Sequence, residues 1–344
     1  MKLNNFKNKS ILITGASGSI GSALIFNLFK NYNFKVIRAV SNDENGLFEL
    51  TYNLSNSLKN FSTFMRSNKI RLIHGDIRNY ERCLQVTSDI DIVIHAAAMK
   101  HVPICEYNPD EAINTNVLGT QNMLNASIKN KVEKFVLIST DKAANPQTIM
   151  GTTKLMAEKL TINANNFYIK KNFYCIRFGN IIGSRGSVLE IFKKQLYKGS
   201  NLTVTSSEMT RFFMDMNEAA LGVLSSLNIS RGGEIFIIKS MQAFKIVDLA
   251  KALISSLKNK SKIIYIGKKP GEKLHEELLT AEESKNAIEN KKFIIINESY
   301  SYSDNIKFYL GKKLKNFNLL SSSTVKLLNK NEILEYLKKK INTN

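Results

Sequence analysis

A glycine-rich turn near the start of the chain constrains the fold more than any other feature. The segment 14–21, Thr-Gly-Ala-Ser-Gly-Ser-Ile-Gly, follows a short apolar run at residues 10–14 and opens a helix-length segment reaching about residue 29. Glycines allow a tight turn there and let the backbone approach a diphosphate, whose charge meets the helix N-terminus. At the first strand–helix junction, such a turn predicts a dinucleotide site. Its predicted binding residues are Gly15, Ser17, Gly18, Ser19, Ile20 and Gly21.

Apolar runs and helix-length segments alternate along the first 180 residues. This alternation predicts βα units and a parallel sheet with helices on both faces, which is a doubly wound α/β fold of the Rossmann type. We therefore expect residues 1–180 to form a domain that binds NAD or NADP. The expected strands are 10–14, 36–40, 70–74, 90–95, 135–139 and 173–178.

The second half of the chain is less regular. A strand is expected near residues 202–205, and helices are expected near 217–227 and 246–257. We expect residues 181–344 to form a smaller, mixed substrate-binding region that caps the open edge of the sheet. The last stretch, from residue 330, predicts an exposed lysine-rich helix and tail.

The net charge of +20 does not by itself indicate nucleic-acid binding. The lysines are spread along the chain, and no arginine-rich or aromatic-interleaved stripe is present, as stacking on single strands would require. A cleft for an anionic nucleotide would use only a few of these charges. No nucleic-acid partner is therefore expected.

Hydropathy and cysteine content favour a soluble protein in a reducing compartment. No run approaches the roughly 18–20 apolar residues of a membrane span, and the N-terminus lacks the apolar core of a signal peptide. Cys83, Cys105 and Cys175 are odd in number and scattered, which favours neither disulfides nor a metal site. We expect a cytoplasmic protein without a membrane span or a bound metal.

The end of the second expected strand bears on the choice of cofactor. An acidic residue there would bond the ribose hydroxyls of NAD and repel the 2′-phosphate of NADP. Ser41 occupies that place, and its hydroxyl can donate to a phosphate, so NADP is permitted. No arginine follows directly, so the preference is soft and NAD remains an alternative. Asp76 and Ile77, after the third strand, are placed to flank the adenine.

Met150 and Lys154 lie four residues apart, shortly after the expected strand 135–139, and share one face of a helix. This layout resembles the active-site strand and helix of the short-chain dehydrogenases/reductases, with methionine in place of the tyrosine usual in that family. A thioether carries no exchangeable proton, so either the protein is inactive or another residue moves the proton. Asp141 and Lys142 follow the strand at the sheet edge where such folds bind ligands, and they form a potential acid/base pair.

Further motifs, spanning roughly residues 9–280, resemble those of the inverting UDP-N-acetylglucosamine 4,6-dehydratases of capsule and glycan biosynthesis, within the extended short-chain dehydrogenases. One branch of that family also carries methionine before Gly-x-x-Lys, so Met150 resembles a family trait. Some relatives have Ser-Arg-Asp-Glu where this chain has Ser-Asn-Asp-Glu at residues 41–44, which leaves the NADP preference open. The motifs are Ala96-Ala-Ala-Met-Lys-His-Val-Pro103, Glu106-Tyr-Asn-Pro109, Ser139-Thr-Asp-Lys-Ala-Ala-Asn-Pro146, Arg177-Phe-Gly-Asn180, Gly183-Ser-Arg-Gly-Ser-Val188, Met209-Thr-Arg-Phe212 and Pro270-Gly-Glu-Lys-Leu-His-Glu276.

The resemblance implies a redox-neutral reaction on a UDP-N-acetyl-hexosamine. Hydride leaves carbon 4 of the sugar for a tightly held NADP or NAD, water is lost across carbons 5 and 6, and the hydride returns to carbon 6. By resemblance, Asp141 takes the 4-hydroxyl proton or protonates the leaving hydroxyl, Lys142 acts at carbon 5, and Thr140 bonds the 4-hydroxyl. Lys142 could act there only with a pKa near neutrality, which burial beside Lys100 and Lys154 would favour.

The same resemblance implies the binding residues. Lys154 would bond the nicotinamide ribose, and arginines would hold the substrate diphosphate by their planar fork. The family also tends to assemble, so a homo-oligomer is expected. The implied cofactor residues beyond the glycine turn are Ala96, Ala97 and Ala98, and the implied substrate residues are Lys100, Asn180, Arg185, Val188, Arg211 and Glu272.

Two other functions remain open. A UDP-sugar 4-epimerase would share the hydride step, but it needs no base at carbon 5, so the Asp141-Lys142 pair argues against it. A non-catalytic NAD(P)-binding sensor is suggested by Met150. It is opposed by the intact Lys100, Asp141, Lys142 and Lys154.

Overall fold

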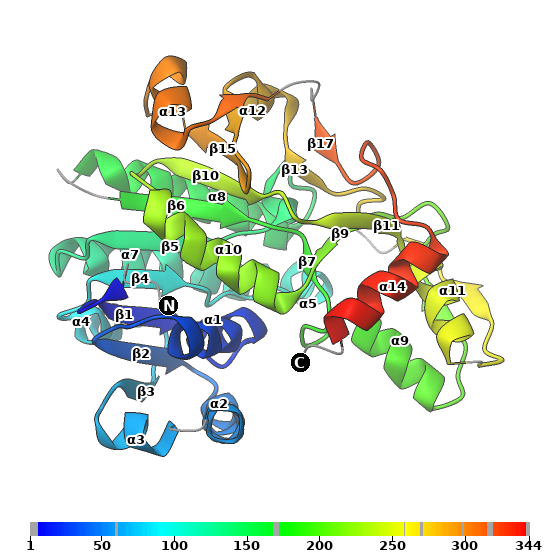
Figure 1. Cartoon of the computed structure of the whole chain (residues 1–344), viewed down its shortest axis with the longest axis horizontal. Helices are drawn as coiled ribbons and strands as arrows, with labels where there is room; N and C mark the ends of the chain where they lie inside the picture. Colours follow the sequence, from blue (N-terminus) through cyan, green and yellow to red (C-terminus); the bar gives the residue numbers. More distant parts are fainter. Residues whose placement is uncertain are drawn as a thin grey trace.

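The computed structural model describes residues 6–58, 61–167, 172–257, 259–268, 271–297, 299–314 and 319–341. Within these residues, a ten-stranded sheet crosses the molecule in the order β16-β14-β15-β10-β6-β5-β4-β1-β2-β3 (Figure 1). The strands from β10 to β3 in this order run parallel. They are β1 (Ser10–Thr14), β2 (Val36–Ser41), β3 (Ile70–His74), β4 (Ile92–His95), β5 (Lys134–Ile138), β6 (Asn172–Arg177) and β10 (Glu234–Ile238). The predicted doubly wound fold is confirmed.

Helices cover both faces of this sheet because successive strand residues point to opposite sides. On β1, Ile11 and Ile13 pack into one apolar core, and Leu12 packs into the other. The first face carries α1 (Ser19–Asn31), α2 (Glu44–Ser57), α3 (Phe61–Arg66), α10 (Met216–Ile229) and α13 (Tyr302–Tyr309). The second carries α4 (Tyr80–Thr87), α7 (Gly119–Lys129) and α8 (Ile149–Asn163).

A smaller lobe stands at one end of the sheet, on the right in Figure 1. Its own apolar core includes Phe213 and Phe244, whose rings stack with centroids 4.1 Å apart. The lobe has the sheets β11-β9-β7 and β12-β8. Its elements are β7 (Asn180–Ile181), α9 (Val188–Tyr197), β8 (Leu202–Val204), β9 (Thr210–Met214), β11 (Gln242–Lys245), α11 (Ile246–Ser256), β12 (Ile263–Tyr265) and α14 (Lys330–Ile341).

The remaining elements connect these layers. Short helices follow β4, and a segment after α11 returns to the edge of the large sheet. They are α5 (Val102–Tyr107), α6 (Pro109–Ile113), the π-helix Asn114–Leu118, the 3-10 helices Asp141–Ala143 and Ala164–Phe167, β13 (Glu277–Leu279), α12 (Ala281–Lys285), β14 (Ala287–Glu289), β15 (Phe293–Asn297), β16 (Lys312–Lys313) and β17 (Leu320–Ser321).

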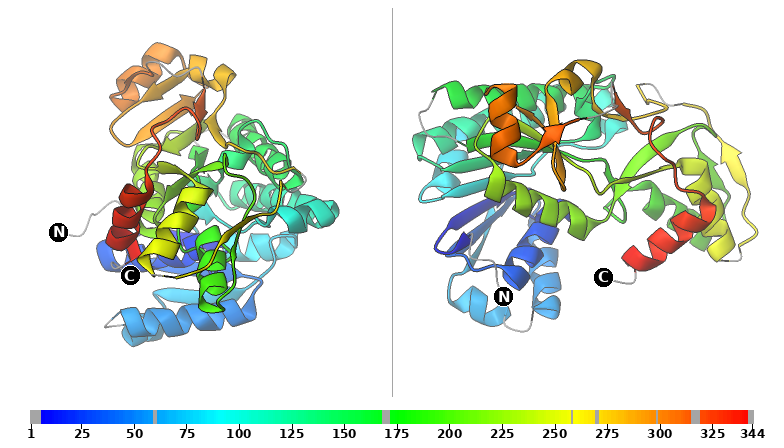
Figure 2. Two further views of the ribbon diagram at one scale, coloured as in Figure 1. Left: turned by 90° about the vertical axis from the view of Figure 1, so that its right-hand side faces the viewer. Right: turned by 45° about the horizontal axis from the view of Figure 1, so that its top comes forward.

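Two expectations about the second half of the chain need correction. The large sheet does not stop at residue 180, because β10 extends it in parallel and β15, β14 and β16 add antiparallel strands. The C-terminal helix is not simply exposed, because Ile333 and Leu337 are buried against the lobe. Figure 2 shows this helix (red) beside α11 (yellow). Residues 342–344 of the expected tail lie outside the described residues.

No helix in the described part of the chain is long and apolar enough to cross a membrane. The three cysteines are buried and free. Within the same residues, no group of three or more His, Cys, Asp and Glu side chains is arranged to hold a metal ion.

A buried ion cluster ties α8 to the sheet. Arg177 on β6 is fully buried and donates through Nε and Nη2 to both carboxylate oxygens of Glu158 on α8, at 2.8 and 2.7 Å. Its Nη1 and Nη2 also donate to Glu283 on α12, at 2.9 and 2.8 Å. Because α8 carries Met150 and Lys154, this cluster fixes the helix that faces the candidate site.

Replacing Arg177 with methionine should lower the free energy of unfolding by about 3–5 kcal/mol, because Glu158 becomes a buried charge without its partner. Urea unfolding followed by circular dichroism measures this. The matched control is Glu133→Gln, which breaks an exposed pair with Lys9 and should cost less than about 1 kcal/mol. Equal losses in the two variants would contradict the structural role of the cluster.

Candidate active site

A cleft of about 940 Å³ lies at the carboxyl ends of the parallel strands, between the large sheet and the smaller lobe. The glycine turn, the segments after β2, β3, β4 and β5, and the loop between β7 and α9 all contribute to its walls. Open α/β sheets bind their ligands at this edge, where the strand order reverses between β1 and β4. The cleft is therefore the candidate site.

The glycine turn packs closely against the backbone of the segment after β4. Gly15 has a φ of +62°, and a Cβ there would meet the backbone N of Ala97 at 2.7 Å and the O of Ala96 at 2.9 Å. Only glycine is therefore accommodated at this position. Gly21 differs, because it packs the helix start against the Gly15 carbonyl and does not line the cleft. The predicted cofactor residues that do line the cleft are Gly15, Ser17, Gly18, Ser19, Ile20, Ser41, Asp76, Ile77, Ala96, Ala97, Ala98 and Lys154.

The region around Ser41 holds the polar groups expected at the adenosine end of a dinucleotide. The Ser41 and Ser17 hydroxyl oxygens are 2.8 Å apart, and the Asp43 amide donates to Ser41 Oγ at 3.1 Å. Asp76 accepts from Arg78, through Nε at 2.9 Å and Nη2 at 2.6 Å. Arg78 also lines the cleft. Sequence reasoning missed it, although its position two residues after Asp76 could have indicated it.

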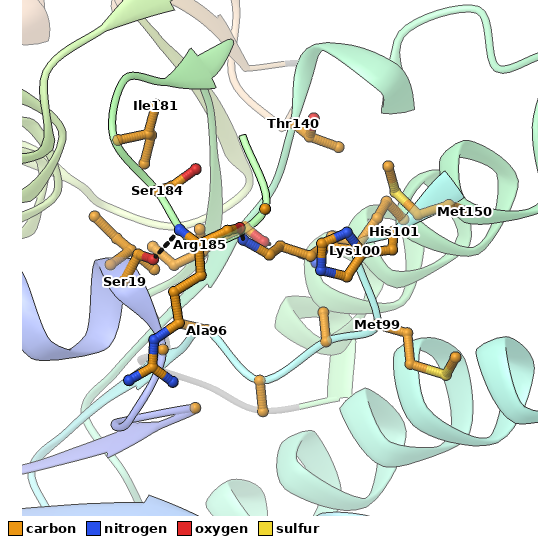
Figure 3. A pocket seen from close by; sticks show the side chains of 18 of the residues that line it. Ser19, Ala96, Met99, Lys100, His101, Thr140, Met150, Ile181, Ser184 and Arg185 are labelled. Carbon is orange, nitrogen blue, oxygen red and sulfur yellow. Dashed lines mark hydrogen bonds between the residues drawn. The ribbon is translucent and has the colours of Figure 1, made fainter. Parts of the chain in front are cut away.

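Arg185 lies differently from its predicted role at the substrate diphosphate. Its Nη2 donates to Glu49 on α2 at 2.6 Å, so the guanidinium turns toward the cofactor side. Its backbone joins the two halves of the cleft, because its N donates to Ser19 Oγ at 3.2 Å and its O accepts from Lys100 Nζ at 2.9 Å (Figure 3). Arg185 is thus a bridge across the cleft, and its predicted diphosphate contact requires a different side-chain position.

Helix α8 presents Met150 and Lys154 to the cleft, as their spacing predicted. Met150 is buried in a small apolar cluster with Cys105 and Ala112. Lys154 is also buried, and its Nζ donates to the carbonyl of Ile138 at 2.8 Å. Burial lowers the pKa of Lys154 to about 8, against the opposing attraction of Glu158.

The Asp141-Lys142 pair is split between the cleft and the interior. Thr140 and Lys142 line the cleft, whereas Asp141 is fully buried and does not. Asp141 Oδ1 accepts from Thr140 Oγ1 and from Lys142 Nζ, both at 2.9 Å. Asp141 therefore does not reach the cleft in this arrangement, and any effect of Asp141 on a ligand passes through Thr140 or Lys142. Its predicted exchange of a proton with the sugar stays a prediction.

The condition stated for Lys142 as a base at carbon 5, a pKa near neutrality, is not met. Burial alone would lower the pKa of this ammonium, but Asp141 and Glu276 outweigh it and raise the pKa above the ordinary value of 10.5. Glu276 Oε1 lies 3.3 Å from Lys142 Nζ. The nearby cation that opposes the two carboxylates is Arg211, rather than Lys100 or Lys154. Lys142 therefore lines the cleft as a charged ammonium.

The predicted substrate residues Lys100, Asn180, Val188, Arg211 and Glu272 all line the cleft. Arg211 is heavily engaged within the protein, because Nη1 donates to the carbonyls of Thr210 and Leu274 and Nη2 to that of Lys273, at 2.7–3.0 Å. Its Nε lies 3.5 Å from Glu276 Oε1. The guanidinium thus positions the segment that carries Glu272 and Glu276.

Sequence reasoning did not assign a role to Glu276. It belongs to the recognised motif 270–276, but nothing in the sequence distinguishes which of its two glutamates faces Lys142. Pro270, the first residue of that motif, lies outside the described residues.

Comparison with known proteins gives the chain its family. A family model described as "Polysaccharide biosynthesis protein" matches residues 11–298. The UDP-N-acetylglucosamine 4,6-dehydratase (inverting) of Campylobacter jejuni is 39% identical over 96% of this chain and 98% of its own length. The capsular polysaccharide biosynthesis protein CapD of Staphylococcus aureus is 43% identical over 80% of the chain, which spans 46% of that protein. A UDP-glucose 4-epimerase of Rickettsia bellii is 37% identical over 96% of both chains.

Solved structures share the fold. Pen from Bacillus thuringiensis superposes with a TM-score of 0.86 and 37% identity, covering 97% of this chain and 99% of its own. The dTDP-glucose 4,6-dehydratase DesIV of Streptomyces venezuelae, solved with NAD and TYD bound, has a TM-score of 0.68 and covers 77% of this chain and 86% of its own. At 19% identity, DesIV supports the fold alone.

The pKa of Lys154 generates a prediction about cofactor affinity. As the pH rises through about 8, the ammonium loses its proton, so affinity for NADP should fall by about tenfold. Fluorescence titration of NADPH against the cofactor-free protein, at several pH values, measures this.

The Lys154→Met variant should bind weakly at neutral pH and lose this pH dependence. Lys159→Met, an exposed position on the same helix, should behave as the wild type. An identical pH dependence in Lys154→Met and the wild type would show that another group is responsible.

Proposed function

We infer the function from the family, because this chain belongs to the polysaccharide biosynthesis protein family of extended short-chain dehydrogenases/reductases. We propose that it is a UDP-N-acetylglucosamine 4,6-dehydratase that inverts carbon 5. The full-length similarity to the Campylobacter jejuni enzyme of that name supports the substrate class. The similarity to CapD supports a place in surface polysaccharide biosynthesis. The observation that carries the proposal is the charged Lys142 at the cleft wall, since carbon 5 must exchange a proton in this reaction.

The cleft fits a nicotinamide dinucleotide, because the glycine turn lines it at the N-terminus of α1, where a diphosphate is favoured. The glycine turn would hold the diphosphate, and Lys154 would hold the nicotinamide ribose. Ser41, at a strand end without a carboxylate in its place, supports NADP, while NAD remains an alternative. A nicotinamide held there would supply the hydride chemistry of the reaction, the oxidation at carbon 4 and the reduction at carbon 6.

Side chains of the protein would carry out the proton transfers of the reaction. Thr140 faces the cleft and already donates to Asp141 at 2.9 Å, so the proton of the 4-hydroxyl has a path through Thr140 to the buried carboxylate. The proton that leaves carbon 5 departs with the carbon 6 hydroxyl as water, and the proton that Asp141 takes from the 4-hydroxyl can return to Lys142 along their 2.9 Å hydrogen bond. Inversion requires that the proton leaving carbon 5 and the proton arriving there use opposite faces, and therefore two different groups. Lys142, charged at rest, suits the role of the donor that protonates carbon 5 in the last step.

Met150 fits this division of roles. It carries no proton to exchange, and its packing with Cys105 and Ala112 gives it a part in shaping the cleft wall. The proton chemistry of the missing tyrosine is assigned to Thr140, Asp141 and Lys142. The homo-oligomer that the family resemblance implies stays a prediction.

A second candidate is a UDP-sugar 4-epimerase, which the Rickettsia relatives favour by name. It shares the carbon 4 oxidation and uses no proton exchange at carbon 5. The charged Lys142 has no task in that reaction, so the dehydratase is the better supported of the two.

Incubation with UDP-N-acetylglucosamine in deuterated water, followed by proton NMR, tests the proposal. A dehydratase gives a new methyl signal at carbon 6 and deuterium at carbon 5. A 4-epimerase gives a UDP-N-acetylgalactosamine spectrum without solvent deuterium. If neither this substrate nor UDP-glucose reacts although cofactor is bound, both enzymatic functions are contradicted and the non-catalytic sensor is favoured.

In the Lys142→Met variant the rate of product formation should fall by at least about 100-fold, because the last proton transfer lacks its donor. Reduced nicotinamide should still accumulate when substrate is added, since carbon 4 oxidation does not depend on Lys142. Absorbance of the reduced cofactor and NMR of the product measure the two steps. Met150→Leu is the matched control in the same cleft wall and should retain turnover within about threefold. Full turnover of Lys142→Met would contradict the assigned role.

A further inference from the structure

Glu276 is a buried carboxylate with no role in the function described so far. Its side chain is 3% exposed, and it lies directly before β13. The backbone is fixed on both sides by Ser322, because the Glu276 N donates to Ser322 Oγ at 2.9 Å and its O accepts from the Ser322 N at 2.8 Å. The position of this carboxylate is therefore set by the fold.

The carboxylate faces two cations of the cleft. Its Oε1 lies 3.3 Å from Lys142 Nζ and 3.5 Å from Arg211 Nε. Its Oε2 is buried and has no hydrogen-bond partner within the described ranges of the chain, and the same holds for Asp141 Oδ2. An unsatisfied buried oxygen costs about 1–3 kcal/mol, so two of them beside one lysine call for a functional explanation.

Lys142 lies between these two carboxylates. Among the described residues, its Nζ donates to Asp141 Oδ1 at 2.9 Å and to Asn180 Oδ1 at 3.3 Å. Lys142 also lines the cleft and its side chain is 19% exposed, so its ammonium is within reach of a ligand there. Glu276 adds charge to this arrangement at 3.3 Å.

We propose that Glu276 is a positioning residue that, together with Asp141, holds the Lys142 ammonium charged and aimed into the cleft as the proton donor for carbon 5. The inference rests on the proposed function for the identity of the carbon atom. The arrangement of Lys142, Asp141 and Glu276 itself does not depend on it.

The charges around Lys142 set the expected size of the effect. Asp141 and Glu276 raise its pKa, whereas burial and Arg211 lower it. Removing one of the two carboxylates leaves burial and Arg211 opposed by Asp141 alone. An adjacent opposite charge typically changes a pKa by about one to three units, so the pKa of Lys142 should fall by about one unit or more.

A glutamine at position 276 separates this charge effect from a structural one. Glutamine keeps the volume and leaves the backbone bonds to Ser322 in place. Arg211 also keeps its bonds to the carbonyls of Thr210, Lys273 and Leu274. The matched control is Glu277→Gln, the adjacent residue, whose carboxylate accepts from Asn145 at 3.3 Å instead of facing Lys142.

The experiment is an NMR titration of lysine side chains in protein labelled with ¹³C,¹⁵N-lysine, with the Lys142 signal assigned by its loss in Lys142→Arg. In the wild type and in Glu277→Gln, Lys142 should stay charged beyond the ordinary lysine value of 10.5. In Glu276→Gln its pKa should fall by about one unit or more, and in Glu276→Asp it should stay nearer the wild type. An unchanged Lys142 pKa in a folded Glu276→Gln protein would overturn the proposal.

Turnover gives the second readout and separates this inference from the proposed function. The ratio of Glu276→Gln to wild-type turnover cancels titrations that both proteins share, including that of Lys154. This ratio should fall by about tenfold for each unit by which the pH exceeds the lowered pKa of Lys142. A lowered pKa together with a flat ratio would overturn the donor role, and absence of dehydratase product in the wild type would overturn only the proposed function.

Discussion

The contact of Lys142 with two buried carboxylates is the interaction on which the site depends. Asp141 comes from the 3-10 helix after β5, Asn180 from β7, Arg211 from β9, and Glu276 from the segment before β13. Two buried carboxylates are costly unless they are paired, and Lys142 and Arg211 are the cations that face them. The large sheet and the smaller lobe thus meet at one charge cluster, and its lysine lines the cleft.

Much of the fold could be predicted from local patterns. The glycine turn, the apolar runs of the parallel strands and the Met150–Lys154 spacing all depend on residues close together in the chain. The large sheet continues past the domain boundary expected at residue 180. Strand pairing is long-range, and β10 and β15 join the sheet from later in the sequence. The expectation that the C-terminal helix is exposed was wrong, because the surface that buries Ile333 and Leu337 forms only in the folded lobe.

The electrostatic state of the site could not be predicted in the same way. The sequence indicates that Asp141 and Lys142 act together, but the pKa of Lys142 depends on Glu276, which is distant in the chain. Nor does the sequence indicate that Asp141 is buried behind Thr140, or that the Arg185 side chain pairs with Glu49. This arrangement explains why Met150 needs no exchangeable proton, since Lys142 in the same cleft already carries one.

The most direct test of the account is a crystal structure of the protein with NADP and UDP-N-acetylglucosamine bound. The account predicts Lys142 Nζ within about 3.5 Å of carbon 5, with Asp141 and Glu276 behind it and Thr140 at the 4-hydroxyl. A bound sugar whose carbon 5 lies far from Lys142, or which contacts the Asp141 carboxylate directly, would contradict it.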